Sequence, residues 1–192
     1  MPLRLGPLKI PWGDRSEHKN DPYWDLFINR AVADPNNLVS EIMVKAPEGN
    51  INPARADLHT PDITSAHIKE FASYLGADLV GIARLNDGAD EDEQPFAVIC
   101  GVKAEQDPAR APGVGGQTPA VNSQYVSFVV AAYIRELGYR ATSAPQPEAA
   151  RLAARAGLGT LGSDGRLVTP KFGSKVHVAE VIRTDLPLAA DG

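Results

Sequence analysis

The residues best suited to hold a ligand lie in the C-terminal part of the chain, between Ala154 and Leu188. This segment, ARAGLGTLGSDGRLVTPKFGSKVHVAEVIRTDLPL, contains five glycines and a Thr169-Pro170 break. Glycines at this density indicate a main chain that adopts conformations forbidden to other residues, or that another group approaches closely. Two interpretations stay open. The bare main chain holds a large flat ligand, or it forms a tight loop that only turns the chain.

Within this segment, Gly157-Leu-Gly159-Thr-Leu-Gly162 has the G-x-G-x-x-G spacing of dinucleotide-binding sites. Such a site needs a strand before the glycines and a helix after them, because the helix N-terminus binds the pyrophosphate. Here a predicted helix precedes the glycines and β structure follows. No acidic residue ends a second strand about 20 residues later, as that site requires. The sequence therefore does not predict a dinucleotide site.

Three further side chains have types that could take part in acid–base chemistry or binding. Lys175 and His177 are two residues apart in a predicted strand, so they share one face of it. Tyr125 lies early in a predicted helix, four residues before Val129, so its ring can face the core. Cys100 lies in an apolar predicted strand, where a thiol is an inert core group rather than a nucleophile.

The order of several motifs resembles the cobalamin-dependent reductive dehalogenases. The segment that begins at Gly157 is similar to the part of those enzymes that follows a helical IR-x-LGY-x-A stretch, which here runs from Ile134 to Ala141. The similarity begins near Ile68, with IKEFASYLGADLVGIARL, and covers about two thirds of the chain. Epoxyqueuosine reductase is a more distant relative with a similar core.

The resemblance implies a nitroreductase-like core that binds cobalamin in its base-off form. Bare main chain would meet the amides and the nucleotide-loop phosphate of the corrinoid. The residues carried over to this cofactor site are Gly157, Leu158, Gly159, Ser163, Thr169, Phe172 and His177. A tight loop remains the alternative for all the loop residues.

The resemblance also implies catalytic roles for Tyr125 and Lys175. The tyrosine would donate a proton to the substrate carbon and the lysine would stabilise the phenolate. A phenol with a pKa of about 10 is a weak acid at neutral pH unless a nearby cation stabilises its anion. A core tyrosine and solvent-facing basic residues remain the alternative.

Asp57-Leu-His59 resembles the start of a D-x-H-x-x-G motif, in which a histidine replaces the lower ligand of cobalt. Asp62 stands where the glycine should be, and Pro61 precedes it. We therefore expect no histidine on cobalt from this motif, and no metal ligand from the chain.

The resemblance breaks after TDLPL, residues 184–188, where only AADG follows instead of a cysteine-rich module with two iron–sulfur clusters. The single cysteine cannot hold such a cluster, which needs about four thiolates. We expect either a stand-alone corrinoid domain or part of a longer or split enzyme. In both cases electrons would come from an external donor or from a separate iron–sulfur subunit.

The pattern of prolines, glycines and apolar residues predicts an α/β (α+β) sandwich. Residues 1–60 form an irregular N-terminal arm with a short helix at Pro22–Ala33, and residues 61–192 form the corrinoid-binding domain. Thr64 or Ser65 caps the first domain helix, which Gly76 ends. The remaining expected elements are strands at 77–85 and 95–104, a loop at 106–120, a helix at 122–137, a strand at 139–143, a helix at 147–156, and β runs at RLVT and KVHVAEVIRT that form a hairpin.

Composition limits the class of protein. The chain has 192 residues, 43% hydrophobic and 22% charged, which is typical of one globular domain. A net charge of −5 does not favour binding to nucleic acid or to an anionic membrane. No apolar run reaches the roughly 20 residues of a membrane span, and the first residues lack the apolar centre of a signal peptide. We expect a cytoplasmic location.

Three functions follow. The leading one is a cobalamin-binding protein that reduces a carbon–halogen bond. A non-catalytic cobalamin carrier or sensor is the second. A nitroreductase-like protein that binds flavin as a homodimer is the third.

Overall fold

The computed structural model describes residues 49–85, 94–104, 114–178 and 180–192. The helix expected at 22–33 and most of the acidic loop that follows Leu85 lie outside these residues. The elements in chain order are α3 (Pro61–Leu75), β1 (Leu79–Arg84), β2 (Phe96–Lys103), α4 (Val114–Glu136), β3 (Ala141–Pro145), α5 (Ala149–Arg155), β4 (Thr160–Leu161), β5 (Leu167–Val168), β6 (Val176–His177) and β7 (Glu180–Thr184).

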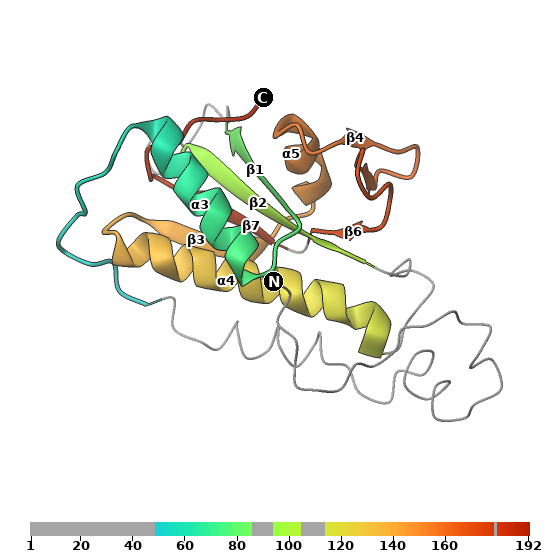
Figure 1. Cartoon of the computed structure of the whole chain (residues 1–192), viewed down its shortest axis with the longest axis horizontal. Helices are drawn as coiled ribbons and strands as arrows, with labels where there is room; N and C mark the ends of the chain where they lie inside the picture. The colour runs from blue at the N-terminus through green and yellow to red at the C-terminus, as the bar shows by residue number, and fades with distance from the viewer. Residues whose placement is uncertain (1–48, 86–93, 105–113, 179) are drawn as a thin grey trace.

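These helices and strands form a sandwich around one antiparallel sheet (Figure 1). The strand order is β1-β2-β7-β3, and β6 pairs with the end of β2. Helices α3 and α4 cover one face of the sheet, and α5 with the small β4–β5 sheet covers the other. The prediction of a mixed helix–sheet sandwich is therefore confirmed.

The alternation of side chains along the strands divides the core into two layers. On β2, Val98 and Cys100 face α3 and α4, whereas Ala97 and Ile99 face α5. The layer under α3 and α4 is the larger of the two. Its fully buried members include Ile68, Ala72, Ile82, Val126, Val130, Ile134, Ile182 and Leu186.

Helix α3 begins earlier than the capping pattern predicted. Thr60 is the N-cap residue and Pro61 opens the helix, where its missing N–H costs nothing. Thr64 and Ser65 are buried inside the helix, and the Ser65 hydroxyl accepts a hydrogen bond from the Ala189 N–H at 2.8 Å. The predicted caps are therefore wrong. Gly76 does end the helix, in the left-handed conformation that was expected for it.

Helix α4 also begins earlier, at Val114 instead of Asn122. The segment was predicted to be a loop up to residue 120 because it is rich in glycine and proline. Gly116, Pro119 and Ala120 are nevertheless buried within the helix. The burial of these residues thus outweighs the low helix propensity of this segment.

Residues 49–60 have no regular structure, as predicted, and their main chain is bound to the end of α4. The Asn52 N–H donates to the Arg135 carbonyl, and the Ala56 N–H to the Leu137 carbonyl, both at 3.0 Å. The Arg55 guanidinium lies 4.8 Å from the centre of the Tyr139 ring. The end of α4 therefore anchors this segment to the domain.

The TDLPL motif ties the end of β7 to the start of β3. The Thr184 hydroxyl donates to the Arg140 carbonyl at 2.7 Å, and Asp185 accepts from the Arg140 N–H at 2.6 Å. Leu186 and Leu188 are buried in the larger core layer. The motif is thus part of the packing of this domain.

The residues after the motif run along the outer edge of β1. The Asp191 N–H donates to the Ile82 carbonyl at 2.9 Å, and its carboxylate accepts the Ile82 N–H at 2.8 Å and pairs with Lys69. These contacts satisfy the main-chain N–H and carbonyl groups of Ile82, which an edge strand would otherwise leave open to pairing with another strand.

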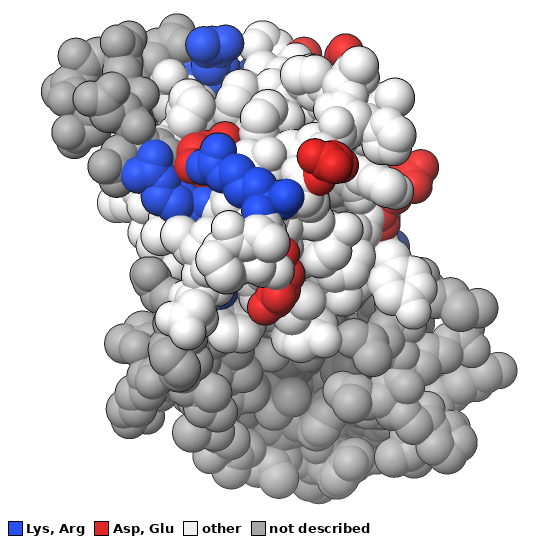
Figure 2. Space-filling view, turned by 90° about the vertical axis from the view of Figure 1, so that its left-hand side faces the viewer, with Lys and Arg blue, Asp and Glu red and all other residues white. Residues whose placement is uncertain are grey.

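Acidic and basic side chains are mixed on the face shown in Figure 2, and neither sign dominates it. None of the described helices combines the length and the apolar character that a membrane crossing requires.

Candidate functional site

The glycine-rich segment forms a lobe beside α5, at one end of the molecule (Figure 1). Gly157 follows α5 with a φ of +72°, a backbone conformation that favours glycine, and a β-carbon there would meet nothing within 4 Å. Gly159 differs, because a β-carbon there would lie 2.9 Å from the Val168 carbonyl carbon and closer still to its oxygen. Both interpretations of the glycines therefore apply to this segment. The main chain is accessible at Gly157, and it is tightly packed at Gly159.

The RLVT and KVHVAEVIRT runs are strands, as predicted, but they do not pair with each other. RLVT contributes β5, which pairs back with β4, whereas KVHVAEVIRT contributes β6 and β7 to the main sheet. The expected hairpin is wrong in its pairing, because β4 is formed by the short run Thr160–Leu161, which the pattern did not indicate.

Thr169 and Phe172 belong to a tight turn in the same lobe. The buried Thr169 hydroxyl accepts from the Phe172 N–H at 3.1 Å and donates to the Gly173 carbonyl at 3.2 Å. Phe172 is half-buried, and the Lys171 ammonium lies 4.9 Å from its ring centre. The hydroxyl therefore holds the turn, and the aromatic ring is the side chain left partly open to a ligand.

Leu158 and Ser163 differ in accessibility. Leu158 is half-buried against the smaller core layer, whereas Ser163 is exposed in the turn between β4 and β5. The structure therefore brings Gly157, Leu158, Gly159, Thr169 and Phe172 into one lobe, with Ser163 at its exposed turn.

Lys175 and His177 lie on the other side of the sheet from this lobe. His177 pairs directly with Val102, which places both side chains on one face. A β-carbon on Gly101 would meet Val176 and Val178, so these two valines occupy the opposite, α5-facing side. His177 therefore faces α4. Lys175 extends the same pairing, since its carbonyl accepts the Ala104 N–H at 2.9 Å, and its side chain is exposed.

The environment of His177 disfavours the charged imidazolium. Burial lowers its pKa from 6.5, because desolvation penalises the protonated ring. His177 is therefore a largely neutral imidazole at neutral pH.

Tyr125 does not face the core, contrary to expectation. The residue is 43% exposed. Ser123, two residues earlier, faces the sheet and donates to the Cys100 carbonyl at 3.2 Å. A separation of two residues turns a helical side chain by about 200°, which directs Tyr125 away from the sheet. In the part of the chain that the structure describes, no hydrogen bond joins Tyr125 to Lys175.

Cys100 is a buried core thiol. Burial raises its pKa to about 12, and a contact with the Ser127 hydroxyl lowers it only in part. The prediction of an inert thiol is confirmed.

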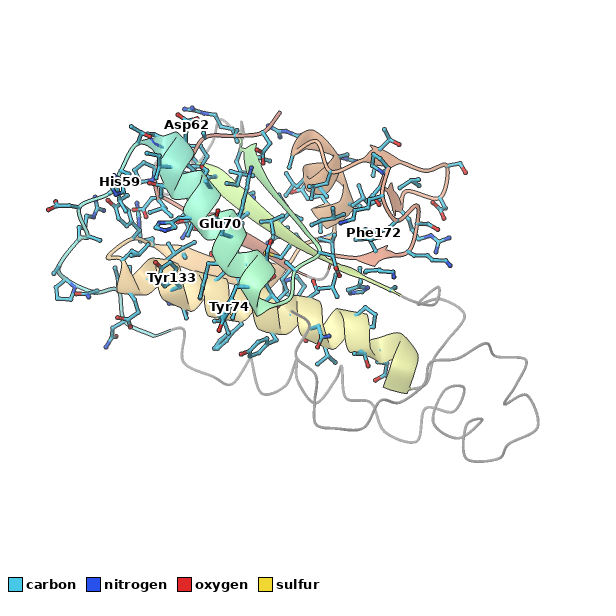
Figure 3. All side chains as sticks on the ribbon, viewed as in Figure 1. His59, Asp62, Glu70, Tyr74, Tyr133 and Phe172 are labelled. Carbon is cyan, nitrogen blue, oxygen red and sulfur yellow. The ribbon has the colours of Figure 1, made fainter. Side chains whose placement is uncertain are left out.

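His59 and the glycine lobe are far apart. Figure 3 shows His59 before α3 at one end of the molecule and Phe172 at the other. Among the described residues, no cluster of three or more histidine, cysteine or carboxylate side chains could hold a metal ion.

The sequence reasoning did not single out Glu180. The residue is 6% exposed, and its carboxyl group accepts a hydrogen bond from the Ser143 hydroxyl. Its sequence signal was a charged residue in the middle of the apolar run KVHVAEVIRT, at a position that reaches the core only because of the strand register.

Comparison with known proteins gives a consistent result, although no family model matches the chain. The chain is 39% identical over 72 residues to the tetrachloroethene reductive dehalogenase of Desulfitobacterium hafniense. This match covers 36% of the chain and 13% of the relative. The corresponding protein of Dehalobacter restrictus matches equally well.

Solved structures extend the likeness to most of the chain. The catabolic reductive dehalogenase NpRdhA aligns with a TM-score of 0.66 and 27% identity, over 81% of this chain and 24% of that chain. A reductive dehalogenase structure that suggests a mechanism for B12-dependent dehalogenation aligns with a TM-score of 0.63 and 26% identity, over 81% of this chain and 23% of that chain.

Epoxyqueuosine reductase of Bacillus subtilis aligns more weakly, with a TM-score of 0.47 and 12% identity. The chain spans about a quarter of the length of the dehalogenase structures and 13% of the curated relatives. In sequence and in fold, this chain is reductive dehalogenase-like.

Proposed function

We propose that this chain is a cobalamin-binding domain of the reductive dehalogenase type, with a nitroreductase-like core. The observation that carries the proposal is the alignment of 81% of the chain with a dehalogenase whose reaction is B12-dependent. The bound cofactor, reduced by an external donor, would supply the electrons that cleave a carbon–halogen bond. The chain would supply binding, orientation and a proton.

The glycine lobe fits one part of such a ligand better than another. The N–H groups of Gly157 and Leu158 donate to the carbonyls of Ala154 and Ala153, so these amides are not available to a phosphate. The open main chain at Gly157 suits the amide side chains of a corrin ring, which can donate to carbonyl oxygens. The exposed Ser163 hydroxyl suits the phosphate, because a hydroxyl can donate a hydrogen bond to a phosphate oxygen. We propose base-off binding against this lobe, with Phe172 on the ring.

The first test is retention of the cofactor. Purified protein is incubated with hydroxocobalamin under anaerobic conditions and desalted, and its visible spectrum is recorded. We expect a retained, base-off spectrum in the wild type and reduced retention in Phe172→Ala. Tyr74→Ala removes an exposed aromatic ring from α3, away from the lobe, and serves as the matched control. Loss of all corrinoid from the wild type would reject the proposal.

A test of the roles proposed for Tyr125 and Lys175 distinguishes an enzyme from a cobalamin carrier. If Tyr125 donates the substrate proton and Lys175 stabilises its phenolate, Tyr125→Phe retains cobalamin and loses dehalogenation. The exposed, outward position of Tyr125 favours the carrier as the second candidate. Cobalamin retention without turnover in the wild type, with a low-potential reductant and several organohalides, would support carriage. A flavin spectrum in the purified protein would support the flavin-binding alternative instead.

A further inference from the structure

Helix α4 is apolar on the face that points away from the sheet. Ser123 marks the direction of the sheet, because its hydroxyl donates to the Cys100 carbonyl. Each residue turns the helix by about 100°, so the positions opposite Ser123 can be read from the sequence. Between residues 121 and 132, every position within about 60° of that opposite direction is apolar. These positions, which we call the outer stripe, are Val121, Tyr125, Phe128, Val129 and Ala132.

The outer stripe is unusual for a helix that faces water. Tyr125 is exposed, and the other four side chains of the stripe are half-buried. On the other side of α4, Val126, Val130 and Ile134 fill the larger core layer. The sequence from Val114 to Ile134 contains no charged residue. A helix that is apolar all round is normally buried all round, so the outer stripe is a surface that another segment should cover.

Helix α3 lies on the same face of the sheet and shows the ordinary pattern, since it exposes Asp62, His67 and Glu70. It packs beside the outer stripe and not on it. The contact is made by the rings of Phe71 and Tyr133, whose centroids are 4.5 Å apart, and Figure 3 shows Tyr133 where the two helices meet. The outer stripe is therefore left uncovered by α3.

The described chain begins at the C-terminal end of α4 (Figure 1). A β-carbon on Gly49 would lie 3.7 Å from the Arg135 Nε, and the Asn52 N–H donates to the Arg135 carbonyl. Residues 1–48 are therefore attached to the domain at one end of the helix that carries the outer stripe.

Residues 22–33 have an apolar pattern and a length that fit this surface. Trp24, Phe27, Ile28 and Val32 recur at helical spacing, which predicts a helix with one apolar face. That helix would be about 18 Å long, and the outer stripe is about 17 Å long. Residues 34–48 can span roughly 50 Å when extended, which exceeds the length of α4, about 35 Å. The connection is thus long enough to bring the predicted helix to any part of the outer stripe.

We propose that residues 22–33 dock on the outer stripe of α4, with the apolar face of the predicted helix against the apolar side chains of the stripe. A second copy of the chain is the rival occupant of this surface. The covalent connection favours the N-terminal segment, because a short flexible linker gives an effective concentration on the order of millimolar. This docking needs no cofactor, so it goes beyond the proposed function.

Tryptophan fluorescence tests the docking, because both tryptophans, Trp12 and Trp24, precede Gly49. In a Trp12→Phe background, we expect Trp24 to emit at a shorter wavelength than in the urea-unfolded chain. Val129→Asp should shift this emission to the unfolded wavelength, with circular dichroism to check the fold. Val168→Asp changes an exposed valine on β5, across the sheet from α4, and should leave the emission unchanged. Native emission at the unfolded wavelength, or emission that a folded Val129→Asp variant does not shift, would overturn the proposal.

A cysteine pair tests the same contact even if Val129→Asp fails to fold. Phe27→Cys is combined with Val129→Cys, the protein is oxidised, and peptide mass spectrometry maps the disulfide. Both positions lie near the middle of their segments, so they meet whichever way the docked helix runs. Cys100 does not compete, because it is buried and its pKa is about 12.

We expect an intramolecular disulfide between positions 27 and 129. The control pair, Phe27→Cys with Val168→Cys, should form none. Absence of the disulfide between 27 and 129 would overturn the proposal. Cross-linked dimers in its place would assign the outer stripe to a second copy of the chain.

Discussion

Gly159 packs its bare α-carbon against the carbonyl group of Val168, at the junction between α5 and the β4–β5 sheet. The contact is between two main-chain segments, so neither partner can move a flexible side chain aside. We expect Gly159→Ala to destabilise the fold by about 1–3 kcal/mol, the range for overpacking a tight site. Urea unfolding measures the change. Ser163→Ala, in the exposed turn of the same sheet, should be neutral, and an equal loss in both variants would contradict this explanation.

Asp185 is predicted to be the strongest anchor of the TDLPL motif. Its carboxylate accepts the Arg140 N–H at 2.6 Å and the Arg140 Nε–H at 3.2 Å, and its side chain is 15% exposed. Asp185→Ala leaves partly buried donors without an acceptor, so we expect a loss of about 1–3 kcal/mol in the free energy of unfolding. The matched control is Asp164→Ala, which breaks an exposed contact with Arg166 in the β4–β5 turn. The urea concentration at the midpoint of unfolding should be the same in Asp164→Ala as in the wild type.

Cys100 should resist alkylation in the folded protein. Its thiol is buried and its pKa is about 12, so the reactive thiolate is absent at neutral pH. We expect iodoacetamide to label Cys100 only after unfolding, which mass spectrometry detects. Rapid labelling under native conditions would contradict the structure around β2.

The same thiol predicts a loss of stability in alkali. The folded-state pKa is raised above the ordinary value of 9.0, so between about 9 and 12 the unfolded chain releases a proton that the folded protein keeps. The contribution of Cys100 to stability is therefore full below pH 9 and declines as the pH rises through this window. Urea unfolding at a series of pH values should show a shallower decline in Cys100→Ala.

The raised pKa of Glu180 predicts a similar decrease of stability with rising pH, in a lower pH range. Its pKa is raised from the ordinary 4.5, so the folded state binds more protons than the unfolded state above that value. Stability should fall as the pH rises from 4.5 through the raised pKa, and Glu180→Gln should remove this part of the slope. Glu70→Gln, on the exposed side of α3, is the control. A pH dependence that persists in Glu180→Gln would show that another group causes it.

Regular patterns in the sequence predicted the regular elements well. The strands around Ile82 and Cys100 were expected from their apolar runs, and α3 and α4 from their buried stripes. The early start of α4 was missed because Gly116 and Pro119 disfavour a helix locally, and only their burial in the folded protein compensates for that. The start of α3 was also missed for this reason. The hydroxyl groups of Thr64 and Ser65 favour a helix cap locally, but both residues lie buried inside α3.

The candidate site was predictable in part. The motif order indicated the likeness to reductive dehalogenases, and the glycine spacing indicated the lobe that contains Gly157 and Phe172, because glycine spacing and β runs are local features. The position of Tyr125 was not predictable, since a shift of one or two residues in the helix register turns a ring from the core to the solvent. The role assigned to Lys175 depends on the same kind of register and remains a proposal.

The sequence by itself determined the mixed helix–sheet class, the inert environment of Cys100 and the similarity to reductive dehalogenases, since each depends on residue order or local periodicity. Only the tertiary structure decided that Glu180 is buried and that it shares a face with His177. That relationship follows from a one-residue bulge between β6 and β7, and a bulge is visible only when the partner strand is known. Strand pairing joins residues that are far apart in the chain, so no local pattern specifies it.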